Sequence, residues 1–162
     1  MKKLLLCLTI ITLCNYAVAQ KQVTIKGGTV VPVEAIKEVK ATSVHVGQIV
    51  DLQVSRDVIV DGIVAIKAGT IVKSTVYEAK RSTAFGTKGR LGLRIKYLTL
   101  PSGDTVTFSS SDIYIQGKNR TAISVIVFCF TYLPFPCGSK AVLKPGIEYE
   151  AMVSANTTVT IE

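Results

Sequence analysis

The chain has 162 residues, of which 48% are hydrophobic, and a formal net charge of +8 at pH 7. This length suits one domain with a real hydrophobic core. His45 is the only histidine, and together with the seven-residue gap between Cys129 and Cys137 it gives no metal-binding signature. The positive charge favours anionic partners such as lipid headgroups, lipopolysaccharide or acidic polysaccharide, or else it only keeps the surface soluble.

Residues 1–19 have the features of a cleavable secretory signal peptide. Lys2 and Lys3 give a positive start, an apolar run follows, and Ala17-Val18-Ala19 offers a cleavage site before Gln20. An uncleaved anchor and a lipoprotein signal are the alternatives. We expect a mature chain of 143 residues, 20–162, with a net charge of +6 because Lys2 and Lys3 leave. Export argues against a nucleic-acid partner.

The mature sequence predicts an all-β fold, a small barrel or sandwich of short antiparallel strands. Val, Ile and Thr are dense, and Gly or Asp-Gly breaks separate the strand candidates. Residues 34–39 are left open between a helical turn and an irregular edge, and His45 is placed in an alternating strand. The expected strands lie at 22–26, 29–33, 49–54, 57–60, 63–66, 70–79, 91–100 and 105–109.

A basic, glycine-rich loop, residues 80–90, separates two of these strands. In the second strand we expect Leu91, Leu93, Ile95 and Tyr97 to share one face. Pro101-Ser102-Gly103-Asp104 is a hairpin turn. The loop and the basic residues before position 122 form a candidate anion-binding face, the alternative being simple solvation. Its residues are Lys80, Arg81, Lys88, Arg90, Lys118 and Arg120.

Residues 122–136 form an apolar segment without a single charge, too short for a comfortable helical span and interrupted by Pro134 and Pro136. Three interpretations stay open. The segment is a buried core strand, a membrane-dipping loop with basic flanks, or a docking patch for another protein. The candidate contact residues are Ile126, Phe128, Phe130, Tyr132, Leu133 and Phe135.

Cys129 and Cys137 are the two cysteines outside the expected signal. An oxidising compartment permits a disulfide between them, which would stabilise the short loop by about 2–3 kcal/mol. A pair of buried or lipid-facing thiols is the alternative.

The stretch from Val44 to Ser109 resembles the periplasmic β-barrel of the TrbI/VirB10 family of type IV secretion scaffold proteins. The matching pieces are Gly47–Val50, Asp57–Val58, Ile66–Thr70, and the stretch from Gly89-Arg90 through Leu100-Pro101-Ser102-Gly103. The resemblance implies a barrel in the cell envelope. The chain departs from the family by its cleavable signal and by lacking a proline-rich stalk. Residues 122–136 match no motif of the family's apolar insertion, which reaches the outer membrane. We therefore take from the resemblance the barrel and the envelope setting, but not a place in a secretion machine.

Catalytic chemistry finds little support in this sequence. A nucleophile needs a neighbouring base, and the single His45 is expected to have a core or surface role. We expect no catalytic, cofactor or metal site. The leading hypothesis is an exported, non-enzymatic envelope protein that docks to a membrane or a protein partner through its apolar segment. It would reside in the periplasm, at the outer membrane or on the cell surface. The alternative is a soluble periplasmic binding module for an anionic ligand or glycan.

Overall fold

The computed structural model describes residues 21–83, 87–109, 111–118 and 138–161, and within these ranges the chain forms strands and turns without a helix. The strands are β1 (Lys21–Ile25), β2 (Val30–Ala35), β3 (Val39–Lys40), β4 (Ile49–Val54), β5 (Val58–Val60), β6 (Ile63–Ile66), β7 (Ile71–Lys80), β8 (Arg90–Thr99), β9 (Thr105–Ser109), β10 (Asp112–Gln116), β11 (Val142–Leu143), β12 (Tyr149–Val153) and β13 (Thr157–Ile161). The predicted signal at 1–19 lies outside the described residues.

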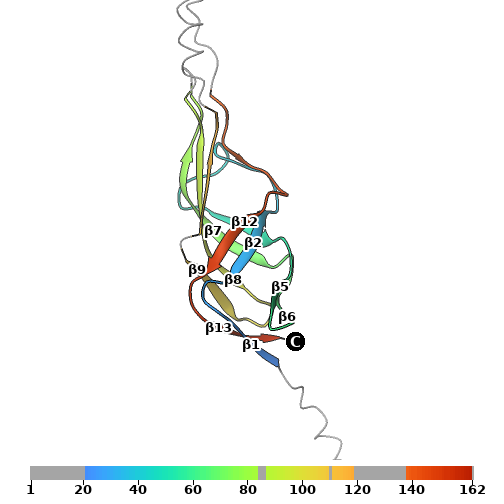
Figure 1. Cartoon of the computed structure of the whole chain (residues 1–162). Helices are drawn as coiled ribbons and strands as arrows, with labels where there is room; N and C mark the ends of the chain where they lie inside the picture. The colour runs from blue at the N-terminus through green and yellow to red at the C-terminus, as the bar shows by residue number, and fades with distance from the viewer. Residues whose placement is uncertain (1–20, 84–86, 110, 119–137, 162) are drawn as a thin grey trace, which may run out of the picture.

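Six antiparallel strands close into a barrel in the order β8–β7–β4–β2–β12–β9, and β9 pairs back with β8. Closure leaves no free edge in this part of the sheet, which protects it from pairing with other chains. Figure 1 shows the barrel in the middle of the molecule, with β7 and β8 continuing beyond it. The predicted all-β fold is confirmed, and a barrel rather than a sandwich is the form that it takes.

The long strands β7 and β8 belong to two structures at once. Their inner halves complete the barrel, because β4 pairs with β7 only as far as Thr75 and β9 pairs with β8 at Tyr97–Thr99. The outer half of β8, Arg90–Arg94, pairs with β10 instead. We call the three segments 76–80, 90–94 and 112–116 the ribbon. It extends from one end of the barrel (Figure 1).

The opposite end of the barrel carries two small strand pairs: β1 with β13, which joins the two ends of the described chain, and the hairpin of β5 and β6 (Figure 1). The β5–β6 turn has Asp61 at φ 52° and Gly62 at φ 78°. Two consecutive residues with positive φ define the turn that matches the natural twist of a hairpin, which is why Asp-Gly occurs there. This turn was predicted from the sequence and is confirmed.

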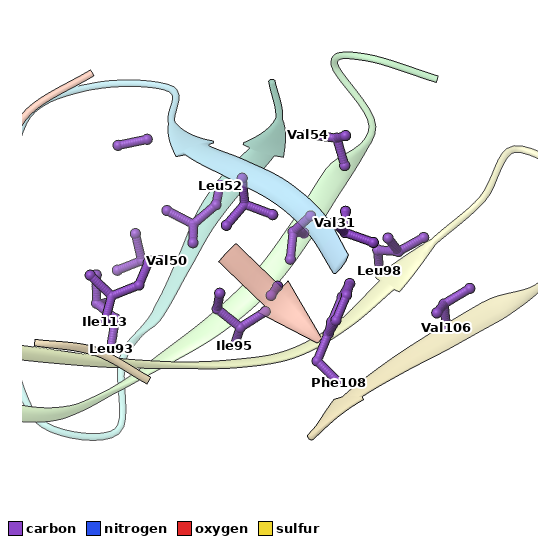
Figure 2. Close-up of a cluster of buried hydrophobic side chains, with 14 of the residues drawn as sticks. Val31, Val50, Leu52, Val54, Leu93, Ile95, Leu98, Val106, Phe108 and Ile113 are labelled. Carbon is purple, nitrogen blue, oxygen red and sulfur yellow. The ribbon is translucent and has the colours of Figure 1, made fainter. Parts of the chain in front are cut away.

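The barrel interior is filled by aliphatic side chains from neighbouring strands. Figure 2 shows Val31, Val50, Leu52, Ile95 and Leu98 pointing into the space between the strands. All of them are buried, and each such side chain contributes roughly 1.5–3 kcal/mol. Ser74 is the polar exception, and its hydroxyl donates to the Val50 carbonyl oxygen at 2.7 Å. Among the described residues, no buried side-chain nitrogen or oxygen lacks a partner.

An irregularity between β7 and β8 makes the prediction for Tyr97 wrong. Lys73 pairs with Tyr97 while the next residue, Ser74, pairs with Ile95, so Lys96 is an extra residue in β8. A bulge of this kind breaks the inward–outward alternation of a strand. Leu98 therefore takes the buried position, and Tyr97 is 38% exposed.

The backbone between β2 and β4 tests the predictions for residues 34–39 and for His45. Of the alternatives for residues 34–39, the irregular edge is correct, since β2 ends at Ala35 and β3 begins at Val39. The placement of His45 in a strand is wrong, because it lies exposed in a turn before β4. The Gln48 amide donates to the His45 carbonyl oxygen at 3.1 Å and the Gln48 side chain accepts from the His45 amide, which holds the chain in the turn.

Candidate functional site: the basic tip of the ribbon

The outer end of the ribbon is closed by four backbone segments that are distant in sequence. The Gly117 amide donates to the Gly89 carbonyl oxygen at 3.0 Å, and the Gly89 amide donates to Ser139 at 3.1 Å. Ser139 in turn donates to the Lys118 carbonyl oxygen at 3.2 Å. We call residues 80–83, 87–90, 116–118 and 138–140 the ribbon tip. The two ends of segment 119–137, which itself lies outside the described residues, are therefore held together at this tip.

Glycines make this close crossing feasible. A Cβ atom on Gly117 would lie 1.8 Å from the Ser139 carbonyl oxygen, and one on Gly89 would lie 2.8 Å from the Ala141 nitrogen. Neither distance is compatible with a side chain, and both neighbours are backbone atoms that cannot turn away. Glycine is therefore needed at positions 89 and 117 because the backbones approach closely there, and not because of an unusual φ angle.

A hollow opens at the tip between the end of β7 and the start of β8. We call it the basic hollow. Its walls carry four cations and two threonine hydroxyls, and the lining residues are Ala79, Lys80, Arg81, Thr83, Thr87, Lys88 and Arg90. Lys80 and Arg90 are direct cross-strand neighbours, which brings two positive charges side by side. Like charges in this position repel unless an anion lies between them.

The only carboxylate that pairs with the basic hollow in the described part of the chain belongs to Glu78. Its Oε1 atom lies 3.6 Å from Nη1 of Arg90 and 4.0 Å from Nζ of Lys80. Lys88 donates to the side-chain oxygen of Gln116, a neutral partner that leaves its charge uncompensated. Arg81 forms no ion pair within the described residues. Four cations thus face one carboxylate, and the hollow keeps an excess of positive charge.

One solvent-facing side of the ribbon is braced by an aromatic and ionic cluster. The ring of Tyr77 lies over Gly92, where a Cβ atom would be 2.5 Å from the ring. The Arg94 guanidinium lies 5.3 Å from the centre of the same ring and donates two hydrogen bonds to Asp112, at 2.9 and 3.1 Å. An aromatic ring over a glycine is a known way to stabilise a strand that lacks a side chain. This cluster supports the ribbon behind the basic hollow.

The same contacts shift the proton affinities of the two residues upward. The pKa of Tyr77 is raised, first by its partial burial and then by the negative charge of Asp112. The pKa of Arg94 is raised chiefly by its hydrogen bond to Asp112. Both groups therefore keep their ordinary protonation state at neutral pH, with Tyr77 uncharged and Arg94 positive. The cluster therefore braces the ribbon with a neutral phenol and a positively charged guanidinium.

Most of the described candidates for anion binding lie close together at the ribbon tip. The sequence did not reveal the side chains that contact them. Lys80, Arg81, Lys88 and Arg90 line one hollow, and Lys118 lies in the adjacent backbone crossing. Sequence reasoning missed Glu78 and Gln116, because both look like ordinary polar residues of alternating strands. Several predicted site residues lie outside the described residues: Arg120, the pair Cys129 and Cys137, and the contacts Ile126, Phe128, Phe130, Tyr132, Leu133 and Phe135.

Two kinds of feature are absent from the described ranges. No group of three or more His, Cys, Asp or Glu side chains gathers there in a way that would hold a metal ion. No helix in the same ranges is long and apolar enough to cross a membrane.

Comparison with models of protein families gives no match, and no curated protein matches the chain either. The geometry and charge of the ribbon tip are therefore the basis for assigning a function.

Proposed function

We propose that the chain is an exported, non-enzymatic protein of the cell envelope, in which the barrel presents residues 122–136 to a membrane or to a protein partner. One observation carries the proposal. The two ends of the segment that contains these uncharged residues meet at the ribbon tip, away from the closed barrel and beside the basic hollow.

The composition around the tip supports a membrane contact. Fifteen uncharged residues rich in aromatic side chains are flanked by Lys118 and Arg120 on one side and by Lys140 on the other. Aromatic side chains prefer the level of the headgroups, and lysine and arginine are attracted to anionic lipids. The described barrel closes with six strands of its own. Its closure therefore does not depend on a strand from residues 122–136, which weighs against the core-strand interpretation.

We also propose a distant relationship to the barrel of the TrbI/VirB10 family. The pieces that carry the resemblance lie on β4, on β5, in the turn before β7 and along β8, so most of them are barrel elements. An envelope setting follows from this proposal, while the departures at the N-terminus and in residues 122–136 leave a role in secretion out of it.

The alternative function is a soluble periplasmic module that binds an anionic ligand or glycan in the basic hollow. The four cations that line the hollow support it. The two functions differ in what residues 122–136 are needed for, namely localisation in the first and nothing beyond folding in the second.

Fractionation of the processed protein from the cell envelope tests the proposal. We expect membranes to retain it through a high-salt wash and then through an alkaline carbonate wash, because apolar contacts survive both. A matched variant replaces residues 119–137 by a short Gly-Ser linker, which is feasible since Lys118 and Ser139 are already hydrogen-bonded. This variant should fold, as judged by its thermal unfolding, and should leave the membrane. A wild-type protein found entirely in the soluble fraction would refute the membrane form of the proposal.

A further inference from the structure

We infer that the basic hollow is a binding site for the phosphate group of an anionic phospholipid headgroup. The inference rests on the membrane form of the proposed function and adds the class of ligand and the residues that hold it. The apolar segment would supply the attachment, and the hollow would select an anionic lipid surface over a neutral one.

The donors in the hollow suit a phosphate group. Arg81 and Arg90 carry planar guanidinium groups, which bind two phosphate oxygens at once. Lys80 and Lys88 add compact positive charges, and the hydroxyls of Thr83 and Thr87 add further hydrogen-bond donors. A phosphate diester has oxygens pointing in several directions, so donors arriving from two strand ends and a loop can all reach it.

The arrangement differs from that of ordinary surface cations on the same molecule. Across the barrel, cations are paired one to one with carboxylates: Lys40 with Glu38, Lys73 with Asp51, and Arg56 with Glu148. Other cations outside such pairs, such as Lys26 and Lys67, lie singly beside turns. In the basic hollow four described cations lie together, and the one carboxylate paired there, Glu78, is shared by Lys80 and Arg90 alone.

Two cationic side chains of the hollow are already held in position before a ligand binds. Glu78 holds the Arg90 guanidinium against the strand, and Gln116 holds the Lys88 ammonium without cancelling its charge. Side chains that are positioned before the ligand arrives lose less conformational entropy on binding. Arg81 remains available to close over the ligand, because it forms no ion pair among the described residues.

The position of the hollow matches the place of phosphates in a bilayer. Thr83, which lines the hollow, accepts a hydrogen bond from the Gly138 amide at 3.4 Å, directly after segment 119–137. The headgroup layer on each side of the hydrocarbon core is only about 5–8 Å thick. If residues 122–136 contact the hydrocarbon, the hollow beside Gly138, two residues after Pro136 in the sequence, would lie near the level of the phosphates.

Co-flotation with vesicles tests the inference on the processed, envelope-purified protein. One set of vesicles contains phosphatidylcholine alone and the other a mixture with phosphatidylglycerol. The variant R81Q/K88Q should bind the mixed vesicles about 25-fold more weakly than the wild type, since each cation near an anionic surface contributes about fivefold. Its binding to phosphatidylcholine should be unchanged, and its thermal unfolding should match the wild type.

The control variant K26Q/K67Q removes the same net charge far from the tip. Lys26 follows β1 and Lys67 follows β6, and these two strands lie at the end of the barrel opposite the ribbon (Figure 1). Its binding to mixed vesicles should change little, because salt screens charges beyond about 10 Å at ordinary ionic strength.

The outcomes separate the two proposals. Wild-type protein that floats equally with both vesicles, and loses nothing in R81Q/K88Q, overturns the phosphate site and leaves membrane docking in place. Wild-type protein that floats with neither vesicle overturns both. Inorganic phosphate that binds the wild type but not R81Q/K88Q, with equal flotation of the two proteins on mixed vesicles, would show a site for a soluble anion and overturn the lipid assignment. If R81Q/K88Q and K26Q/K67Q lose the same affinity for mixed vesicles, net charge alone explains the binding, and the phosphate site is overturned.

Discussion

The same two long strands run from the barrel to the ribbon tip, yet charge is balanced differently at these two places. On the barrel, Lys73 lies 2.8 Å from Asp51 on the neighbouring strand, a local and neutral pair. At the ribbon tip, Lys80 and Arg90 face each other across β7 and β8 and share Glu78. Exposed neutral pairs contribute little to stability, but they leave the surface without a strong field. The unbalanced tip keeps a positive field, and this field is what the proposed anion site would use.

The two regions also differ in how they are stabilised. Leu98 lies within the closed barrel, whereas Leu91 lies seven positions earlier on the same strand, in the three-stranded ribbon. Both are fully buried. Ala141 and Leu143, which follow the tip, belong to the same hydrophobic cluster as the ribbon residues. The ribbon is thus an extension of the core that has fewer strands around it.

The largest expected effect comes from substitutions in this shared core. Leu98→Ala should lower the free energy of unfolding by about 2–5 kcal/mol, because a fully buried leucine leaves a cavity. Hydrogen exchange should then speed up in all barrel strands. Leu91→Ala makes the same chemical change in the ribbon, and faster exchange should be confined to the outer halves of β7 and β8 and to β10. Identical exchange maps for the two variants would show that barrel and ribbon unfold as one unit.

A smaller effect is expected from the glycine at the tip. Gly117→Ala should cost about 1–3 kcal/mol, because its Cβ atom would overlap the Ser139 carbonyl oxygen, 1.8 Å away. Thermal unfolding and exchange at the tip would measure this cost.

A matched control is Gly146, which has φ 78° but no atom within 4 Å of a Cβ position. Gly146→Ala should cost roughly 1–2 kcal/mol through backbone strain. Asparagine tolerates this region, so Gly146→Asn should recover part of the loss. Gly117→Asn should recover nothing, and a recovery there would contradict the steric explanation.

The smallest effect concerns alkaline pH and the barrel strand β12. Burial raises the pKa of Tyr149 above its ordinary value of 10.0. The neutral phenol therefore favours the folded state at pH values below 10, and this contribution is lost as the pH rises through the folded-state pKa. The loss of stability between neutral pH and pH above about 10 should be smaller in Tyr149→Phe than in the wild type. Equal losses in the two proteins would show that Tyr149 does not carry this part of the pH dependence.

Most strands of the barrel were predictable from sequence, because their signals are local. The alternation in 49–54 and 71–80 and the turns at Asp61-Gly62 and Pro101–Asp104 depend on side-chain sterics and on φ preferences within a few residues. Tyr97 was misplaced because the bulge at Lys96 depends on the pairing of β8 with β7, which no local pattern encodes. In the candidate site, the cations of 80–90 were recognised by their density, but Glu78 and Gln116 were not, since their roles exist only across strands.

The sequence by itself determined the all-β character, the excess of positive charge and the presence of one long uncharged segment. These are properties of composition and of neighbouring residues, so they hold before the chain folds. The tertiary structure alone decided which strands close the barrel and that β8 serves both barrel and ribbon. It also decided that Lys118, Gly138 and the basic hollow meet at one tip. Such meetings depend on strand register between distant segments, as in Lys21 opposite Ile161, and register is fixed only when the whole core packs.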